Sequence, residues 1–350
     1  MTRRRPHAHA GPASEPPRPP LRPRYVGVDV GGTNVRVAVW SGADASPALA
    51  SAAALPGGLG SLVELVAAAA APPVAAVAVG VPGRVAGGVA AWVPNVPYLE
   101  GRDVAGELSA RLRAPVALAN DGHMALLGEA RFGAARGVRD ALLVTVGTGI
   151  GGAIMRSGRL VRGANGTAGS FGWLSCGAPP RSAADDASSA RRAEDAATAS
   201  APAKAPRRAA DDASPPAAEP PQVGPWEATA SGLALERRAS RLRRPVGAHE
   251  LEAAAAAGDG EAAAVIDGFV AEFGAGLASL ASLFDPQVIV VSGGVADLVA
   301  ELLPRLRAVY AVTASPSVRD TPVRVAELGR AAGAFGAAVY AKEGDEVYLP

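Results

Sequence analysis

The sequence has few sulfur-containing and few aromatic side chains. Its 350 residues include one cysteine and three methionines, and aromatic residues make up 4% of the chain. A single cysteine, Cys176, excludes an internal disulfide bond and a metal site built from several thiolates. One unpaired thiol also suits a reducing compartment, so we expect a cytoplasmic protein.

The chain also lacks an excess of charge of either sign. It carries 34 basic and 33 acidic residues, a formal net charge of +1. No global electrostatic field therefore indicates a nucleic acid or an anionic membrane surface as partner. The apolar stretch 62–81 contains Glu64 and the pair Pro72 and Pro73, so it does not predict a membrane-spanning helix.

Two segments lack the apolar side chains that a folded core needs. Residues 1–24 hold seven prolines, six arginines and one glutamate, and residues 178–222 contain no Val, Ile, Leu, Met, Phe, Tyr or Trp. Neither segment can bury enough surface to offset the entropy of ordering. We expect a disordered basic tail at 1–24 and a disordered insert at 178–222. No continuous apolar segment follows the arginines of the tail before residue 25, so an export signal is not expected.

The rest of the chain alternates between strand and helix patterns. Apolar alternation and short apolar runs predict strands at 25–30, 35–40, 74–81, 115–119, 141–146, 153–155, 159–161, 287–292 and 322–327. Helical periodicity and end signals predict helices at 61–71, 103–113, 123–134, 227–242, 249–255, 260–284 and 330–342. Such alternation is typical of the α/β class.

Glycine-rich turns follow two of the predicted strands, at 31–34 (GGTN) and at 147–152 (GTGIGG). Backbone N–H groups can converge in such turns because no Cβ stands in the way, which suits a phosphate group. The second turn matches the G-x-G-x-x-G dinucleotide pattern. A hairpin pattern rather than a helix follows it, and no carboxylate lies about 20 residues further on, so a Rossmann site is disfavoured. In a purely structural interpretation the glycines only shape β-turns.

Seven short motifs, taken in their order along the chain, resemble those of the ROK family of repressors and sugar kinases. They are Asp29-Val-Gly-Gly-Thr-Asn34, Val81-Pro-Gly83 with Pro94-Asn95, Asn120-Asp121, 143–152, 162–166, 230–232 and 284–294. The resemblance covers most of residues 25–342 and implies a two-lobed actin-like ATPase (ribonuclease H-like) fold. We expect a small N-terminal lobe at 25–122, completed by the helix 330–342, and a large C-terminal lobe at 123–329.

The resemblance implies an ATP-dependent sugar kinase, similar to glucokinases, that transfers the γ-phosphoryl group to a hexose hydroxyl. The expected acceptor is the 6-hydroxyl of glucose or of an N-acetylhexosamine. The resemblance places the general base at Asp121, which follows a strand and begins a helix, where the dipole favours a carboxylate. In the alternative interpretation Asp121 only caps the helix. Asp29 is expected to hold Mg²⁺ through water.

Two groups of residues are expected to bind the substrates. ATP should contact Asp29, Gly31, Gly32, Thr33, Asn34, Gly147, Thr148, Gly149 and Gly151 around its phosphates, and Gly293 and Gly294 near its adenosine. The sugar should contact Asn95, Asn120, Asp121, Ser170, Trp173 and Glu227. For Glu227, a structural role at a helix N-terminus is an equal alternative. His123, where the family commonly has asparagine, is expected on the helix surface, with an approach to the pocket as the alternative.

The chain departs from the family pattern near the expected sugar site. Ser170 replaces a sugar-binding glutamate, and Trp173 replaces a histidine that contacts sugar and helps to bind zinc. Cys176 survives alone of the zinc cysteines, and Pro225 stands where a later one would be, so no structural zinc is expected. Packing by Phe171, Trp173 and Trp226 is expected to substitute for the metal. Trp173 also offers a flat face to a sugar ring.

A non-catalytic sugar- or nucleotide-binding regulatory protein is the alternative function. The replacements Ser170 and Trp173 favour it, whereas Asp29, Asp121 and both glycine turns favour retained chemistry. Repressors of the family carry a helix-turn-helix domain ahead of the first phosphate loop, and the 24 proline-rich residues here are too few to form one. We therefore expect no nucleic acid and no membrane partner, and the resemblance implies a homodimer.

Overall fold

The computed structural model describes residues 22–70, 72–86, 88–93, 95–175, 223–243, 246–247 and 250–350. The insert predicted at 178–222 and nearly all of the tail predicted at 1–24 lie outside these residues, as does Cys176. Of the last tail residues, Arg24 belongs to the first strand, so this strand begins one residue earlier than predicted.

Five strands form the first sheet, in the order β3-β2-β1-β4-β7. They are β1 (Arg24–Val30), β2 (Asn34–Trp40), β3 (Ala48–Ala54), β4 (Val74–Val81) and β7 (Val116–Asn120). Strand β1 is antiparallel to β2 and parallel to β4, and β4 is parallel to β7. A separate two-stranded sheet consists of β5 (Arg84–Ala86) and β6 (Val89–Trp92).

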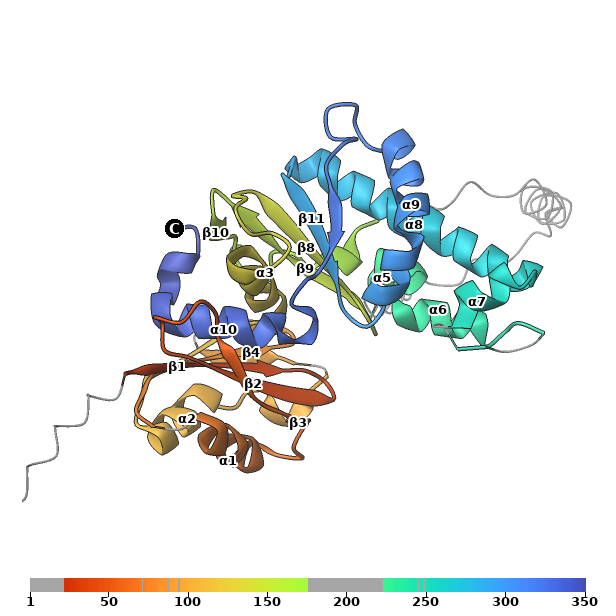
Figure 1. Ribbon diagram of the computed structural model, residues 1–350. Helices are drawn as coiled ribbons and strands as arrows, with labels where there is room; N and C mark the ends of the chain where they lie inside the picture. The colour runs from red at the N-terminus through yellow and green to blue at the C-terminus, as the bar shows by residue number, and fades with distance from the viewer. Residues whose placement is uncertain are drawn as a thin grey trace, which may run out of the picture.

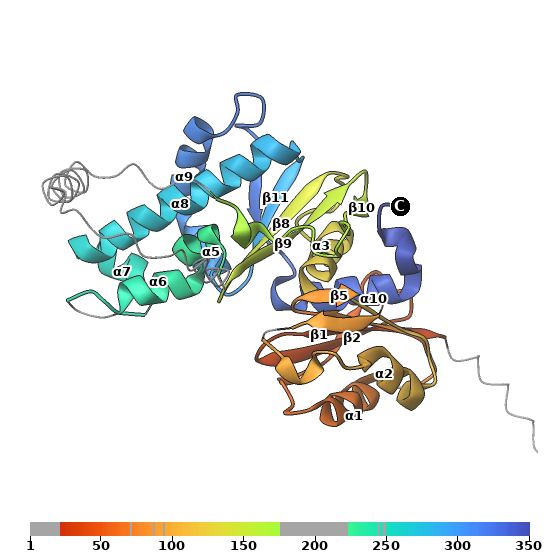
Figure 2. The same cartoon turned by 180° about the vertical axis from the view of Figure 1, so that it is seen from behind.

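The second sheet repeats this topology, in the order β10-β9-β8-β11-β12. Its strands are β8 (Ala141–Val146), β9 (Ile150–Arg156), β10 (Arg159–Leu160), β11 (Val288–Ser292) and β12 (Val323–Val325). Strand β8 is antiparallel to β9 and parallel to β11, as β1 is to β2 and β4. Each sheet therefore starts with a hairpin whose turn is one of the two glycine turns. This repeated unit confirms the predicted two-lobed actin-like fold (Figures 1 and 2).

Helices cover both faces of each sheet. The first sheet packs on α1 (Leu59–Ala70) and α2 (Val104–Leu112) on one face and on α10 (Ala332–Glu343) on the other. Helix α3 (Asp121–Phe132) lies between α10 and the second sheet (Figure 1). The remaining α-helices lie on the far side of the second sheet: α5 (Pro225–Ala230), α6 (Gly232–Ala239), α7 (Leu251–Ala256), α8 (Gly260–Phe284) and α9 (Ala296–Thr313). Short 3₁₀ segments are η1 (Pro97–Leu99), η2 (Phe171–Trp173), η4 (Gly329–Ala331) and η5 (Gly344–Val347).

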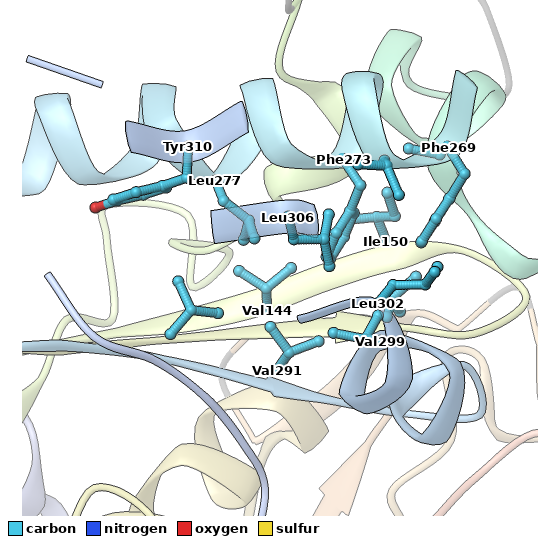
Figure 3. Close-up of a cluster of buried hydrophobic side chains, with 14 of the residues drawn as sticks. Val144, Ile150, Phe269, Phe273, Leu277, Val291, Val299, Leu302, Leu306 and Tyr310 are labelled. Atoms are coloured by element: carbon cyan, nitrogen blue, oxygen red, sulfur yellow. The ribbon is translucent and has the colours of Figure 1, made fainter. Parts of the chain in front are cut away.

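The core of the second lobe lies between its sheet and helices α8 and α9 (Figure 3). Val144 and Val291 face these helices and belong to one hydrophobic cluster with Phe273. Leu143 and Val290 alternate with them and belong to the cluster on the other face, toward α3. Because successive side chains of a strand point to opposite faces, the continuous apolar runs of β8 and β11 fill two cores at once.

Helix α10 packs against β1 and α3 at very short distances. A Cβ at Gly27 of β1 would overlap the carbonyl oxygen of Ala334, and a Cβ at Gly336 would lie 2.7 Å from the amide nitrogen of Gly128 in α3. Glycine is required at these contacts because any side chain would push the backbones apart. The last long helix of the chain therefore holds the first strand and α3 together.

A buried carboxylate joins the connection from α3 to β8 and the connection from β12 to α10. Glu129 of α3 is fully buried, and it accepts hydrogen bonds from the backbone N–H groups of Ala134 (2.8 Å), Glu327 (3.1 Å) and Leu328 (2.9 Å). Ala134 follows α3, and the other two residues lie between β12 and α10. Glu129 thus fixes both connections at one point.

Helix α8 is, among the described residues, the one helix long and apolar enough to cross a membrane by length and composition. Half of its apolar window is buried (50%), and Phe269, Phe273 and Leu277 lie in the core. A core helix passes the same test, so this is a weak indication of a membrane span.

Several elements differ from the prediction. The helix predicted at 227–242 is two helices, because the side chain of Ser231 accepts the N–H of Ala234 and begins α6. The sequence pattern does not predict α9, whose interior contains Pro304, a residue that normally interrupts a helix. It also misses β3, which is rich in alanine.

Candidate active site

Asp121 is the first residue of α3 and follows the last residue of β7. The side chain of Asn120, not that of Asp121, caps the helix: its Oδ1 accepts the N–H of His123 at 3.2 Å. The Nδ2 of Asn120 donates to the carbonyl of Gly83 at 2.9 Å. The Oδ1 of Asp121 accepts the adjacent N–H of Gly122, at 2.8 Å. The cap role that competed with catalysis therefore falls to the neighbouring residue.

Asp29 lies on β1, one residue before the strand ends. Its Oδ2 is 3.9 Å from Nη1 of Arg36, and the two side chains are 17% and 16% exposed. The first turn of α10 lies against the carboxylate, since a Cβ at Gly333 would be 2.6 Å from Cγ of Asp29. A helix N-terminus favours negative charge, so the fold places this carboxylate at a compatible position.

The two carboxylates share one electrostatic environment. Burial raises the pKa of Asp29 from 3.8 to about 6, opposed by the charge of Arg36. Burial and, next, the negative charge of Asp29 raise the pKa of Asp121 from 3.8 to about 7. Two partly buried carboxylates that resist simultaneous ionisation form a site that a divalent cation would neutralise. The oxygen donors suit Mg²⁺, and Asp29 is the residue that would hold it.

The turn between β1 and β2 is the first predicted phosphate loop. The N–H of Gly31 donates to the carbonyl of Asn34 at 2.8 Å and closes the turn. Gly32 and Thr33 are exposed, and Asn34 is already the first residue of β2, with its Nδ2 2.8 Å from Oγ1 of Thr33. A Cβ at Gly32 would touch Cβ of Asn95 at 3.4 Å, so the exposed Asn95 borders this loop.

The turn between β8 and β9 is the second predicted phosphate loop. The N–H of Gly147 donates to the carbonyl of Gly149 at 2.9 Å, and Thr148 is exposed at the tip. Strand β9 begins at Ile150, so Gly151 is a strand residue paired with Thr145 and lies outside the turn. The predicted loop is therefore shorter than the sequence pattern.

Two further segments converge on this second turn. The N–H of Gly232, the first residue of α6, donates to the carbonyl of Gly147 at 2.7 Å. Gly293 has φ = 101°, and a Cβ at Gly147 would lie 3.6 Å from the amide nitrogen of Gly294. The N-terminal ends of α6 and α9 thus lie beside the turn, where backbone N–H groups and helix dipoles favour an anion.

Glu227 is tied to the end of the same turn. Its Oε2 accepts the N–H of Ile150 at 2.7 Å, and a Cβ at Gly172 would lie 3.1 Å from this oxygen. Glu227 therefore connects the second phosphate loop to the segment that carries Ser170 and Trp173. The structure gives it a backbone partner, and the contact with sugar stays a prediction.

The two residues that depart from the family pattern near the expected sugar site, Ser170 and Trp173, have exposed side chains. Ser170 is exposed, and its Oγ donates to the carbonyl of Thr167 at 2.8 Å. Trp173 is 49% exposed, whereas Phe171 is 6% and Trp226 is 1% exposed. The prediction that all three aromatic residues pack in place of zinc is thus wrong for Trp173, whose indole remains accessible to a ligand.

No group of three or more His, Cys, Asp or Glu side chains that could hold a metal ion lies within the described part of the chain. That part leaves out Cys176, and the expected absence of structural zinc stays a prediction.

Two residues of the site are missing from the sequence-based prediction or misplaced by it. The expectation of a surface His123 is wrong, because its side chain is 1% exposed. Arg36 was not predicted, although the hairpin offered a signal: a turn that pairs Val30 with Val35 necessarily places Asp29 opposite Arg36. Burial of His123 has no comparable local signal.

Comparison with known proteins identifies the protein family. The family model described as "ROK family" matches residues 25–344. A relative from Brucella melitensis, "Bifunctional enzyme NanE/NanK", is 32% identical over 231 residues. The match covers 66% of this chain and 36% of that enzyme, so this chain spans about a third of its length.

Two solved structures share the fold over nearly the whole chain. The ROK family glucokinase from Streptomyces griseus, in complex with glucose and AMPPNP, is 27% identical with a TM-score of 0.67, covering 92% of this chain and 100% of that one. The ROK hexokinase from Thermus thermophilus is 30% identical with a TM-score of 0.68, covering 92% and 99%. With a family match over most of the sequence and this agreement in fold, the chain belongs to the ROK family.

Proposed function

We propose that the protein is an ATP-dependent sugar kinase that transfers the γ-phosphoryl group of ATP to a hexose hydroxyl, with Asp121 as general base. The observation that carries this proposal is that the carboxylate of Asp121 does not cap its helix and has a raised pKa. Its neighbour Asn120 caps the helix, and the pKa of Asp121 is raised to about 7. A general base is most effective when its pKa lies near the working pH. The names of the relatives, a glucokinase and a hexokinase among them, support the same reaction class.

In the proposed reaction Asp121 accepts the proton of the sugar hydroxyl as its oxygen attacks the γ-phosphorus. The bond from the γ-phosphorus to the β,γ-bridging oxygen breaks, and ADP leaves. Asp29 would hold Mg²⁺, which would neutralise phosphate charge when bound. The positive charge of Mg²⁺ would also lower the pKa of Asp121, because it would offset the negative charge of Asp29 that raises this pKa.

Phosphate binding is assigned to the two glycine turns. The exposed Thr33 and Thr148 offer hydroxyl groups, and the turn at Gly147 adds the helix ends of α6 and α9. One turn belongs to each lobe, so closing of the lobes would bring both turns onto one nucleotide and exclude water.

Sugar binding is assigned to polar groups around Asp121. Asn95, Asn120, Ser170 and Glu227 offer amide, hydroxyl and carboxylate groups to several sugar hydroxyls, and the accessible indole of Trp173 offers an apolar face. Ser170 is shorter than a glutamate and uncharged, which favours a hexose whose contact at this position needs no charged acceptor. We infer glucose or an N-acetylhexosamine, phosphorylated at O6. We also infer a cytoplasmic homodimer that binds neither nucleic acid nor a membrane.

The test is ADP release by the purified protein with MgATP and a panel of hexoses and N-acetylhexosamines. We expect sugar-dependent ADP formation. The variant Asp121→Asn should lose about 10²–10⁴-fold in kcat while its sugar KM changes by only a few fold. The variant Asp320→Asn, at an exposed position between α9 and β12, is the matched control and should keep wild-type rates.

Two results would contradict the proposal. A folded wild-type protein that releases no sugar-dependent ADP is not a kinase for the panel; sugar binding without turnover in calorimetry would then favour the regulatory binding protein. An Asp121→Asn variant with kcat within tenfold of wild type would remove Asp121 from the role of base.

A further inference from the structure

The buried His123 has no part in the proposed proton transfer. It lies two residues after Asp121 in the first turn of α3, and its backbone N–H donates to the cap Asn120. Its ring has a hydrogen-bond partner at each nitrogen. Nε2 is 2.9 Å from the carbonyl oxygen of Ala168, and Nδ1 is 3.3 Å from the hydroxyl of Tyr348.

These partners determine the tautomer of His123. The carbonyl oxygen of Ala168 can only accept, so Nε2 carries the proton, and the hydroxyl of Tyr348 donates to an unprotonated Nδ1. Burial lowers the pKa of His123, which favours the neutral ring that this arrangement requires.

Ala168 belongs to the segment 162–170, which leads from β10 to Ser170. Within this segment the N–H of Ala168 donates to the carbonyl of Arg162 at 3.2 Å, and both the N–H and the Oγ of Ser170 donate to the carbonyl of Thr167, at 3.2 and 2.8 Å. These bonds shape the segment internally. The bond from His123 instead connects it to the helix that carries Asp121.

On its Nδ1 side the imidazole of His123 contacts Tyr348, whose position is held by two further contacts. The guanidinium carbon of Arg162 lies 4.1 Å from the ring centre of Tyr348, and the N–H of Leu349 donates to the carbonyl of Leu160 at 2.8 Å. The hydroxyl of Tyr348 is thereby held in place toward His123. This fixes the orientation of the ring, and with it the direction of Nε2–H.

A cavity of about 290 Å³ lies beside this cluster. Its lining includes Asn120, His123, Arg162 and Gly166. Gly169 packs tightly on Gly152 of β9, but on the side of the cavity the segment 162–170 lacks such packing, so directional hydrogen bonds have more influence on its position there.

We propose that His123 is a positioning residue: through Nε2–H and the carbonyl of Ala168 it sets the distance of segment 162–170, and so of Ser170, from Asp121. The inference rests on the proposed kinase function and adds the residue that aligns the sugar with the base. An asparagine at this position would be too short to bond both Ala168 and Tyr348.

The test compares two amide replacements that differ in reach. In His123→Gln the amide nitrogen reaches about the place of Nε2 and retains the bond to Ala168, whereas in His123→Asn it reaches only about the place of Nδ1. We expect His123→Asn to lower kcat/KM for the sugar roughly tenfold, mainly through KM, with KM for MgATP within about twofold of wild type. We expect His123→Gln to stay within about threefold for both substrates.

Tyr310→Phe is the control for loss of a buried hydroxyl bond elsewhere. The hydroxyl of Tyr310 donates to the carbonyl of Val318 at 2.8 Å in the second lobe, away from α3. This variant should lower thermal stability without changing the sugar KM. Hydrogen exchange at 163–170 is measured on all four proteins without substrates, and it should become faster only in His123→Asn.

Each outcome decides the inference. It is overturned if His123→Asn shows wild-type sugar KM and wild-type exchange, or if both amide variants lose stability as Tyr310→Phe does with no change in sugar KM. If the wild-type protein releases no ADP with any sugar, the kinase proposal fails by itself. The hydrogen-exchange data then still decide whether His123 holds segment 162–170 in place. A loss of protection in His123→Asn but not in His123→Gln supports this role, and any other pattern contradicts it.

Discussion

The substitution Asp121→Asn is expected to stabilise the folded protein, and to do so more strongly as the pH rises. In the folded protein the pKa of Asp121 is about 7, against an ordinary value of 3.8. Above about pH 4 the unfolded chain therefore releases this proton while the folded protein keeps it. The free energy of unfolding falls as pH rises through the window between these two pKa values. An asparagine has no such proton, so the variant lacks this loss.

The size of the effect follows from the pKa shift. Inside the window each pH unit lowers the free energy of unfolding of the wild type by about 1.4 kcal/mol. Between pH 5 and pH 8 the wild type should lose about 2–3 kcal/mol that Asp121→Asn retains, the lower figure allowing for the partial exposure of the side chain. The amide oxygen can still accept the N–H of Gly122, so the substitution should remove little besides the charge.

The assay is urea unfolding of the wild type and Asp121→Asn at pH 5, 6.5 and 8. Nucleotide and divalent cations are left out, because a cation at Asp29 would neutralise the carboxylates and hide the effect. Asp320→Asn controls for an exposed substitution. A stability difference that is constant within about 0.5 kcal/mol over this range would refute the reasoning, as would a relative loss of stability of Asp121→Asn at pH 8.

Three further predictions concern the fold and its metal content. Glu129→Ala should lower the free energy of unfolding by about 2–4 kcal/mol in urea, since three backbone N–H groups lose the buried carboxylate that accepts their hydrogen bonds; a loss below about 1 kcal/mol would contradict the assigned role. Gly27→Ala should prevent α10 from docking on β1, giving loss of cooperative unfolding in circular dichroism, and a wild-type melting curve would show that the contact can relax. Purified protein should contain far less than one zinc per chain by atomic emission, and its melting temperature should not change with a chelator; stoichiometric zinc would reverse this prediction.

Most of what could be predicted about the site follows from patterns of residues that are close together in the sequence. The two glycine turns follow from glycines placed after apolar strands, and the hairpin around the first turn places Asp29 opposite Arg36. The junction Asn120-Asp121 marks a strand end and a helix start within two residues. Each of these depends on backbone geometry within a few residues, which local residue types largely determine.

Other parts of the molecule depend on contacts that no local pattern specifies. The helix α9 around Pro304 contradicts simple periodicity, and surrounding packing stabilises it. Trp173 is half-exposed, whereas Phe171 and Trp226 pack in the hydrophobic core of the second lobe. Local propensity is a weak term beside burial in such cases.

The sequence by itself determined the α/β class, the two glycine turns and the identity of the candidate base. Only the tertiary structure decided how these parts work together. Helix α10, about 300 residues after β1, packs against that strand and against α3, and burial then raises the pKa values of Asp29 and Asp121. The link from His123 to Ala168 likewise joins segments far apart in the chain. Desolvation and long-range hydrogen bonds arise when distant segments meet, and local residue patterns do not specify which segments will do so.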